Sequence, residues 1–118
     1  MSERDRWIND CAWRLCLHIL PDVLGRDELE PDGYLLEDYG MDALDALEIG
    51  DAISQQWEGI SINADALGFQ QPQPNGNVVL SIRDLAEAIS DAIAEDAASF
   101  IRKFDARRAA RLAASATI

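Results

Sequence analysis

Hydrophobic residues recur along this chain at the spacing of helices. In the first twenty residues they fall three and four positions apart, which is the period of one helix face. This face consists of Ile8, Cys11, Ala12, Leu15 and Ile19. Ser2 is placed to cap the helix, and Pro21 is expected to end it. Four more apolar residues predict burial on more than one side, namely Trp7, Trp13, Leu17 and Leu20.

A long loop and a second helix are expected next. Residues 21–41 carry turn-forming glycines and prolines, together with apolar side chains that we expect to hold the loop against the core. These side chains are Leu24, Leu29, Leu35 and Leu36. Asp42 is placed to cap the second helix, and Gly59 is expected to end it. The expected apolar side of this helix consists of Leu44, Leu47, Ile49, Ile53 and Trp57.

The rest of the chain predicts one short helix and one long helix. Residues 63–69 suffice for one or two helical turns, and the polar segment 70–77 is a loop because prolines and Asn-Gly interrupt it. Ser81 and Asp84 form a capping pair for the last helix. Its apolar stripe consists of Ile82, Leu85, Ala86, Ile89, Ile93, Ala97, Phe100, Ile101 and Phe104. Residues 78–80 favour a strand but have no partner.

These elements predict an all-α fold. We expect a small four-helix bundle, with three main helices and one short one, followed by a helical C-terminal extension. A chain of 118 residues with 48% hydrophobic residues is long enough for one domain with its own core. We therefore divide it into a helical bundle, residues 1–96, and a basic extension, residues 97–118.

The charge is strongly acidic and unevenly spread. The chain has 22 acidic and 10 basic residues, a net charge of -12. Residues 1–96 hold 21 acids and 5 bases, whereas residues 97–118 hold 5 bases and 1 acid. This balance argues against nucleic-acid binding by the bundle. No membrane span is expected, because Arg14 and His18 interrupt the longest apolar run. The charged start and two thiols predict a cytoplasmic protein.

Residues 35–49 resemble the signature of acyl carrier proteins. They read Leu-Leu-Glu-Asp-Tyr-Gly-Met-Asp-Ala-Leu-Asp-Ala-Leu-Glu-Ile, where that family has an acidic-Leu-Gly-x-Asp-Ser-Leu run at the start of its second helix. Residues 23–25, 60–62 and 80–85 resemble the flanking segments of the same family. The likeness covers about residues 4–96 and implies the same four-helix layout, with a place in fatty-acid or polyketide biosynthesis.

The residue that matters most to that family differs here. Its serine carries 4'-phosphopantetheine, and this chain has Ala43 at that place. Attachment needs a hydroxyl oxygen as the nucleophile, and a methyl group offers none. The resemblance thus implies no cofactor as written, and 4'-phosphopantetheine if residue 43 were Ser. Three explanations stay open: a Ser→Ala variant of a genuine carrier, a natural member without the serine, or an unrelated helical adaptor or self-association protein.

Acidic residues wind around the second helix at every third position. Asp42, Asp45, Glu48 and Asp51 form either a solvated face or, as the resemblance implies, a docking surface that includes Leu44. In that family such a surface binds the basic surfaces of acyl-transfer or synthase-type enzymes. Charge complementarity of this kind raises association rates and suits transient partners. We therefore expect a non-catalytic module that docks through its second helix.

Catalytic and metal-binding patterns are not found in the sequence. Cys11 and Cys16 lie five apart on one helix, where they point in different directions, so we expect two small buried hydrophobes. His18 is the single histidine, and we expect it to be partly exposed. We expect neither an enzyme nor a metal site. Trp13 and Trp57 are expected to be core residues rather than the lining of an acyl pocket.

The C-terminal segment carries a basic stripe. Lys103, Arg107 and Arg111 recur every four residues on the expected extension. One interpretation is a frayed helical end. The other is self-association or binding, in which the stripe contacts an acidic surface: the protein's own second helix, a neighbouring copy, or anionic lipid.

Overall fold

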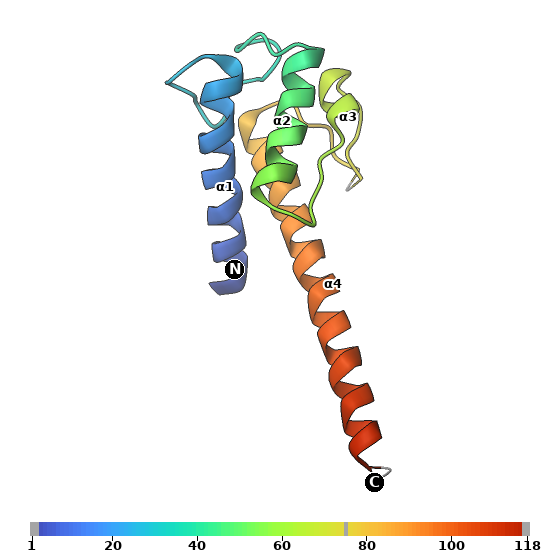
Figure 1. Cartoon of the computed structure of the whole chain (residues 1–118). Helices are drawn as coiled ribbons and strands as arrows, with labels where there is room; N and C mark the ends of the chain where they lie inside the picture. Colours follow the sequence, from blue (N-terminus) through green and yellow to red (C-terminus); the bar gives the residue numbers. More distant parts are fainter. Residues whose placement is uncertain (1–2, 75, 117–118) are drawn as a thin grey trace.

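The computed structural model describes residues 3–74 and 76–116 and shows four helices in that part of the chain. They are α1 (Glu3–Leu24), α2 (Ala43–Gln56), α3 (Ala64–Gly68) and α4 (Ile82–Ala116). α1 and α4 lie side by side and run in opposite directions, with α2 packed against α1 and α3 packed against α2 (Figure 1). β pairing between the described residues is limited to two isolated bridges, Tyr34 with Ser81 and Pro72 with Val78. The expected all-α bundle is confirmed.

α1 does not end at Pro21, as its sequence predicted. It continues to Leu24, because proline lacks only its own N–H and the residues after it still donate theirs. The helix ends at Gly25, whose φ of 67° lies in the left-handed region, and the N–H of Arg26 donates to the Pro21 carbonyl at 3.2 Å. The expected cap, Ser2, lies outside the described residues.

α3 and α4 both begin at side-chain caps, and the sequence predicts the one at Ser81. The Asn63 side chain accepts a hydrogen bond from the N–H of Ala66 at 3.3 Å. At the start of α4, the Ser81 hydroxyl accepts from the N–H of Asp84 at 3.1 Å, and the Asp84 carboxylate accepts from the N–H of Ser81 at 3.0 Å. Side chains therefore satisfy backbone donors at both helix starts.

The loop between α1 and α2 is bonded along the start of α4. Loop carbonyls accept the first two N–H groups of α4, which a helix cannot satisfy internally. The bonds are Ile82 to Gly33 (3.1 Å) and Arg83 to Pro31 (2.8 Å), and Leu35 in turn donates to Leu80 (2.9 Å). The loop therefore keeps a fixed path as it approaches α2.

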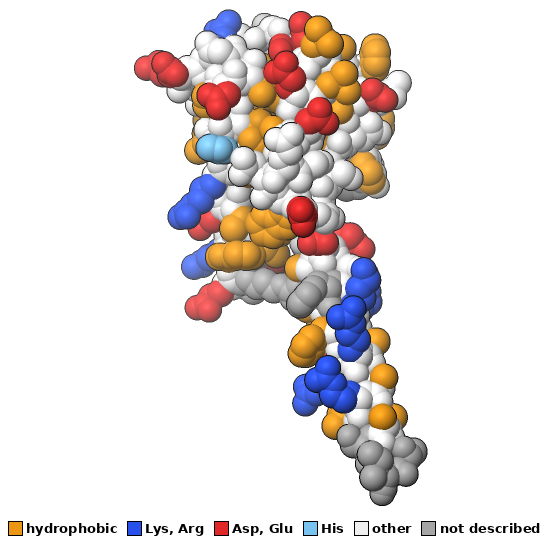
Figure 2. Space-filling model, viewed as in Figure 1, with side chains coloured by type: hydrophobic (Ala, Val, Ile, Leu, Met, Phe, Trp, Pro, Cys, Tyr) orange, Lys and Arg blue, Asp and Glu red, His pale blue; other side chains and the backbone are white. Residues whose placement is uncertain are grey.

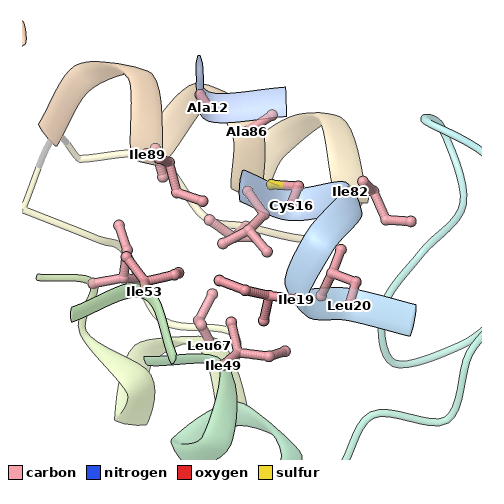
Figure 3. Close-up of a cluster of buried hydrophobic side chains, with 14 of the residues drawn as sticks. Ala12, Cys16, Ile19, Leu20, Ile49, Ile53, Leu67, Ile82, Ala86 and Ile89 are labelled. Carbon is pink, nitrogen blue, oxygen red and sulfur yellow. The ribbon is translucent and has the colours of Figure 1, made fainter. Parts of the chain in front are cut away.

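The core lies where α1, α2 and α3 meet the first half of α4. Figure 3 shows buried side chains from these elements converging on one apolar cluster. The labelled members are Ala12, Cys16, Ile19, Leu20, Ile49, Ile53, Leu67, Ile82, Ala86 and Ile89. The prediction that α1 is buried on more than one side was wrong for two of its residues, since Trp7 is 58% exposed and Leu17 is 53% exposed. The ring of Trp7 meets only the edge of the bundle, where it contacts Trp57 just after α2.

α2 turns only one narrow face to this core. Its buried residues are Ala46, Ile49, Gly50 and Ile53. Leu44 and Leu47, which the sequence placed on the buried side, are 69% and 48% exposed. At about 100° per residue, Leu44 lies on the opposite side of the helix from the buried stripe and Leu47 lies on its flank. The prediction for these two leucines was therefore wrong.

Small residues bring α3 close to α2. A Cβ added at Gly50 of α2 would lie 3.1 Å from the Cβ of Ala64 in α3. One added at Gly68 of α3 would lie 3.7 Å from the Cβ of Ala46. Gly50 therefore leaves little room between the two helices, and a larger side chain there would push them apart, whereas a Cβ at Gly68 would make ordinary van der Waals contacts.

The polar loop after α3 is anchored by a buried amide. Gln73 is only 4% exposed. Its side chain accepts a hydrogen bond from the N–H of Asn63 and donates one to the carbonyl of Asn63, both at 2.9 Å. This pair of bonds satisfies a polar group that would be costly to bury alone. The loop is therefore fixed against the start of α3, which its composition did not indicate.

α4 is one continuous helix of 35 residues, and its second half leaves the bundle (Figure 1). Residues 101–114, here called the tail, are all exposed. The molecule measures 64 × 28 × 24 Å along its principal axes as a result. The division into a bundle of residues 1–96 and an extension of residues 97–118 stays a prediction, since the helix runs through the boundary without a break.

Candidate functional site

The start of α2 is held in place by the loop before it. Met41 is 3% exposed, and its N–H donates to the carbonyl of Leu35, itself buried, at 2.9 Å. Gly40 between them has a φ of 66°, a conformation that glycine adopts without strain. The chain therefore enters α2 from two buried anchors.

Tyr39 fixes the middle of the same loop. Its hydroxyl accepts a hydrogen bond from the N–H of Glu30 at 2.7 Å, and the guanidinium of Arg26 lies over its ring at 5.6 Å from the centroid. The ring fills the space where a Cβ on Gly33 would lie, only 2.6 Å from the Tyr39 Cε2. This hydroxyl is thus engaged within the loop.

The first turn of α2 carries a reciprocal cap. The Asp42 carboxylate accepts from the N–H of Asp45 at 2.8 Å, and the Asp45 carboxylate accepts from the N–H of Asp42 at 3.2 Å. Acidic groups at this end also interact favourably with the helix dipole. The predicted cap at Asp42 is confirmed. Asp45, which the sequence assigned to docking, is half-buried and takes part in the cap.

Ala43 occupies the first helical position, and its side chain is exposed. Ala43 packs beside α3, because a Cβ added at Gly68 would lie 3.8 Å from the Cβ of Ala43. Its methyl group has no lone pair to act as a nucleophile. Position 43 is therefore accessible to a partner but inert as alanine.

One side of α2 combines leucines with acids. Leu44, Leu47, Glu48 and Asp51 are exposed and occupy the i, i+3, i+4 and i+7 positions of a single helix face. We call these four residues the α2 face. Within the described part of the chain, neither Glu48 nor Asp51 takes part in an ion pair. Leu47 was not predicted here, although its three-residue spacing from Leu44 was a visible signal.

The two cysteines are both free thiols. Cys16 is buried, and burial raises the pKa of its thiol to about 12, so it stays protonated and unreactive near neutral pH. Cys11 is half-buried and His18 is exposed. Among the described residues, no three side chains of the metal-binding types come together. The cysteines behave as apolar residues in this fold.

The two tryptophans pack at the edges of the core. Trp13 is half-buried beneath the guanidinium of Arg83, which lies 5.7 Å from its ring centroid. The hydrogen bond from Arg83 to Asp32, at 2.8 Å, and the Asp32 charge raise the pKa of Arg83. Trp57 meets Trp7 edge to face, with ring centroids 6.2 Å apart. Trp57 also lines a shallow recess of about 440 Å³ at the base of the bundle.

The basic stripe lies on the tail. Lys103, Arg107 and Arg111 are all exposed there. Figure 2 shows basic side chains gathered along the projecting half of α4 and acidic ones over the bundle. The α2 face and the tail are therefore separate surfaces of opposite charge.

Comparison with known proteins identifies the family. The family model described as Phosphopantetheine attachment site matches residues 17–76, which is half of the chain and includes all of α2 and α3. The chain belongs to the acyl carrier protein family. Members of this family normally carry 4'-phosphopantetheine on a serine. No curated protein and no solved structure matches the chain.

Family membership gives the site its context. Carrier domains of this family work with synthase and transferase enzymes and are generally non-catalytic themselves. No described helix of this member is long and apolar enough to cross a membrane. The matched segment contains the loop, the capped start of α2 and the α2 face.

Proposed function

We propose that this protein is a carrier-type module that docks on partner enzymes through the α2 face and, as written, carries no acyl group. The observation that carries the proposal is the exposure of Leu44 and Leu47 beside Glu48 and Asp51. Leucines with such exposure supply contact area, and the acids around them supply orientation. The expected partner surface is basic with an apolar centre, as on acyl-transfer or synthase-type enzymes.

The residue at position 43 does not fit the family's prosthetic group. Attachment of 4'-phosphopantetheine requires a hydroxyl, and Ala43 presents a methyl. Tyr39 does not replace it, because its hydroxyl is engaged with Glu30. The chain therefore docks without loading, and its effect on a partner comes from occupying the surface that a loaded carrier would use.

Intact-mass measurement after incubation with coenzyme A and a broad-specificity phosphopantetheinyl transferase tests the proposal. This chain is expected to gain no mass, whereas Ala43→Ser is expected to gain one phosphopantetheine. Loading of Ala43→Ser would support the proposal, because it would mean that the transferase still recognises the surface around position 43 and that only the hydroxyl is missing. Modification of this chain without the substitution would contradict the proposal.

A second measurement separates docking from loading. The unmodified protein should inhibit loading of its own Ala43→Ser variant, because both compete for the transferase. A matched competitor, Glu48→Lys with Asp51→Lys, should inhibit at least tenfold less. If Ala43→Ser is loaded and neither chain inhibits its loading, the α2 face is not a transferase-docking surface and the proposal is wrong.

A further inference from the structure

The molecule exposes more surface than its mass requires. Its accessible surface is 7858 Å², whereas a compact monomer of 13.0 kDa exposes roughly 6,300 Å². Its radius of gyration is 17.5 Å, against about 13.5 Å for a compact domain of this length. The excess of roughly 1,500 Å² per chain is more than the roughly 800 Å² that one partner contributes to a standard protein–protein interface. The tail supplies most of it, since residues 101–114 are all exposed.

The tail carries apolar side chains without cover. Ile101 is 42% exposed, Phe104 is 57% exposed and Leu112 is 62% exposed. A helical segment of this length is marginally stable in water without tertiary contacts. A second chain packed along the tail would stabilise the helix.

Charges along α4 are mirrored about Ser99. Acidic residues of the first half and basic residues of the second half stand at equal distances from it: Asp96 and Arg102, Glu95 and Lys103, Asp91 and Arg107, Glu87 and Arg111. Two such helices placed antiparallel, with their Ser99 residues level, bring the pairs nearest Ser99 into opposition, while the outer pairs turn away because the stripe winds about 40° around the helix every four residues.

The surface at the centre of this mirror is hollow. A groove of about 800 Å³ follows α4 from Ala88 to Lys103 and is walled on its other side by residues 59–62. The recess beneath Trp7 and Trp57 adjoins it, because Asp96, Ser99 and Lys103 line both. Figure 2 shows hydrophobic side chains gathered at this base of the bundle, just above the basic tail.

We propose that two copies of this chain pair through α4, antiparallel about a twofold axis at Ser99. Residues four apart form ridges along a helix, and two such ridges pack at a crossing angle of about 50°. The pairs nearest the crossing, Glu95 with Lys103 and Asp96 with Arg102 of the second copy, contribute most. The tail of each copy lies in the acidic groove of the other, whereas Ile101 and Phe104 lie on the far side of α4 from Ser99 and stay outside this contact.

Charge complementarity favours a second copy over an anionic membrane. A membrane attracts the tail but repels the bundle, which has a net charge of -16 over residues 1–96. It also leaves the mirrored acids of α4 without a role. The ion pair within one chain, Arg102 to Glu95 at 3.7 Å, joins two exposed side chains and is a weak competitor.

The test is the mass of the full chain by sedimentation equilibrium in low salt. The expected result is a dimer of twice the 13.0 kDa chain mass, weakened by added salt. Two charge-reversal variants, Glu95→Lys with Asp96→Lys and Arg102→Glu with Lys103→Glu, should each raise the dimer dissociation constant about 100-fold. Mixing the two variants should restore a dimer, because every reversed contact then meets an opposite charge.

A matched control separates the proposed pairing, in which the two Ser99 residues are level, from a general effect of net charge. Glu48→Lys with Asp51→Lys changes the net charge by the same amount as Glu95→Lys with Asp96→Lys but lies on α2. It should dimerise by itself and should not rescue the tail variant in a mixture. A monomeric unaltered chain, or rescue by the α2 control, would overturn the proposal. So would a monomer that sediments with phosphatidylserine vesicles, which would assign the tail to membranes.

Discussion

The Asp42 carboxylate and the N–H of Asp45 are 2.8 Å apart, and the Asp45 carboxylate returns a bond to the N–H of Asp42 at 3.2 Å. Two acids that the sequence assigned to partner docking thus hold the first turn of α2. Glu48 and Asp51, further along the helix, are exposed and belong to the α2 face. Stability and docking therefore depend on different acids, and substitutions can separate them.

Removal of the cap should destabilise the fold. Asp42→Ala is expected to lower the free energy of unfolding by about 1 kcal/mol, because the N–H of Asp45 loses its partner. Asp42→Asn keeps an acceptor and should cost less. Urea unfolding followed by circular dichroism measures both. Glu48→Gln is the matched control and should stay within about 0.5 kcal/mol of the unaltered chain, because it makes no cap.

Charge reversal on the α2 face should slow recognition without unfolding the protein. In the Ala43→Ser background, Glu48→Lys with Asp51→Lys is expected to lower kcat/KM for transferase loading at least tenfold, since attraction to a basic partner becomes repulsion. The Ala43→Ser variant without the two lysine substitutions should be loaded more slowly as salt is added. Equal loading rates for the two proteins at low salt would show that the transferase does not recognise the charges of Glu48 and Asp51.

Gly33 should tolerate alanine only when Tyr39 is removed. Gly33→Ala is expected to cost about 1–3 kcal/mol of unfolding free energy, because its Cβ would overlap the Tyr39 ring. Tyr39→Leu alone loses the hydrogen bond from Glu30 and should also destabilise. The double variant should cost less than the sum of the two, as a double-mutant cycle of urea unfolding would show. Additive costs would mean that the ring does not limit this position.

Cys16 should make stability fall at alkaline pH. Burial raises the pKa of its thiol from 9.0 to about 12. The unfolded chain therefore releases this proton first, so the free energy of unfolding is unaffected below pH 9 and decreases between pH 9 and 12. The limiting slope is about 1.4 kcal/mol per pH unit.

Comparison with Cys16→Ala isolates this effect, because all other titrating groups are shared. The two proteins should give unfolding free energies that run parallel below pH 9 and converge above it. Parallel curves up to pH 11 would contradict the assignment. Alkylation of the native protein at pH 8 should modify Cys11, which is half-buried, before Cys16.

Much of the local structure could be predicted from the sequence. The caps at Asp42 and Ser81 depend on side chains that bond to backbone groups three residues away, so a short stretch of sequence is sufficient to specify them. The resemblance at residues 35–49 likewise needed only contiguous sequence, and the family match agrees with it. The symmetric spacing of charges about Ser99 is also present in the sequence. It predicts pairing between two helices only because α4 is one continuous helix.

Tertiary packing decided what lies on each side of those helices. Leu44 and Leu47 have the same hydrophobicity as the buried Ile49 and Ile53, and the helical period alone does not say which stripe faces α1 and α3. Gln73 is polar in sequence but buried in the fold, because Asn63, ten residues away, satisfies its amide. The sequence by itself determined the order of the helices, the caps at Asp42 and Ser81, and the separation of charge. Only the tertiary structure decided which apolar and polar groups face the core, because burial depends on neighbours that are distant along the chain.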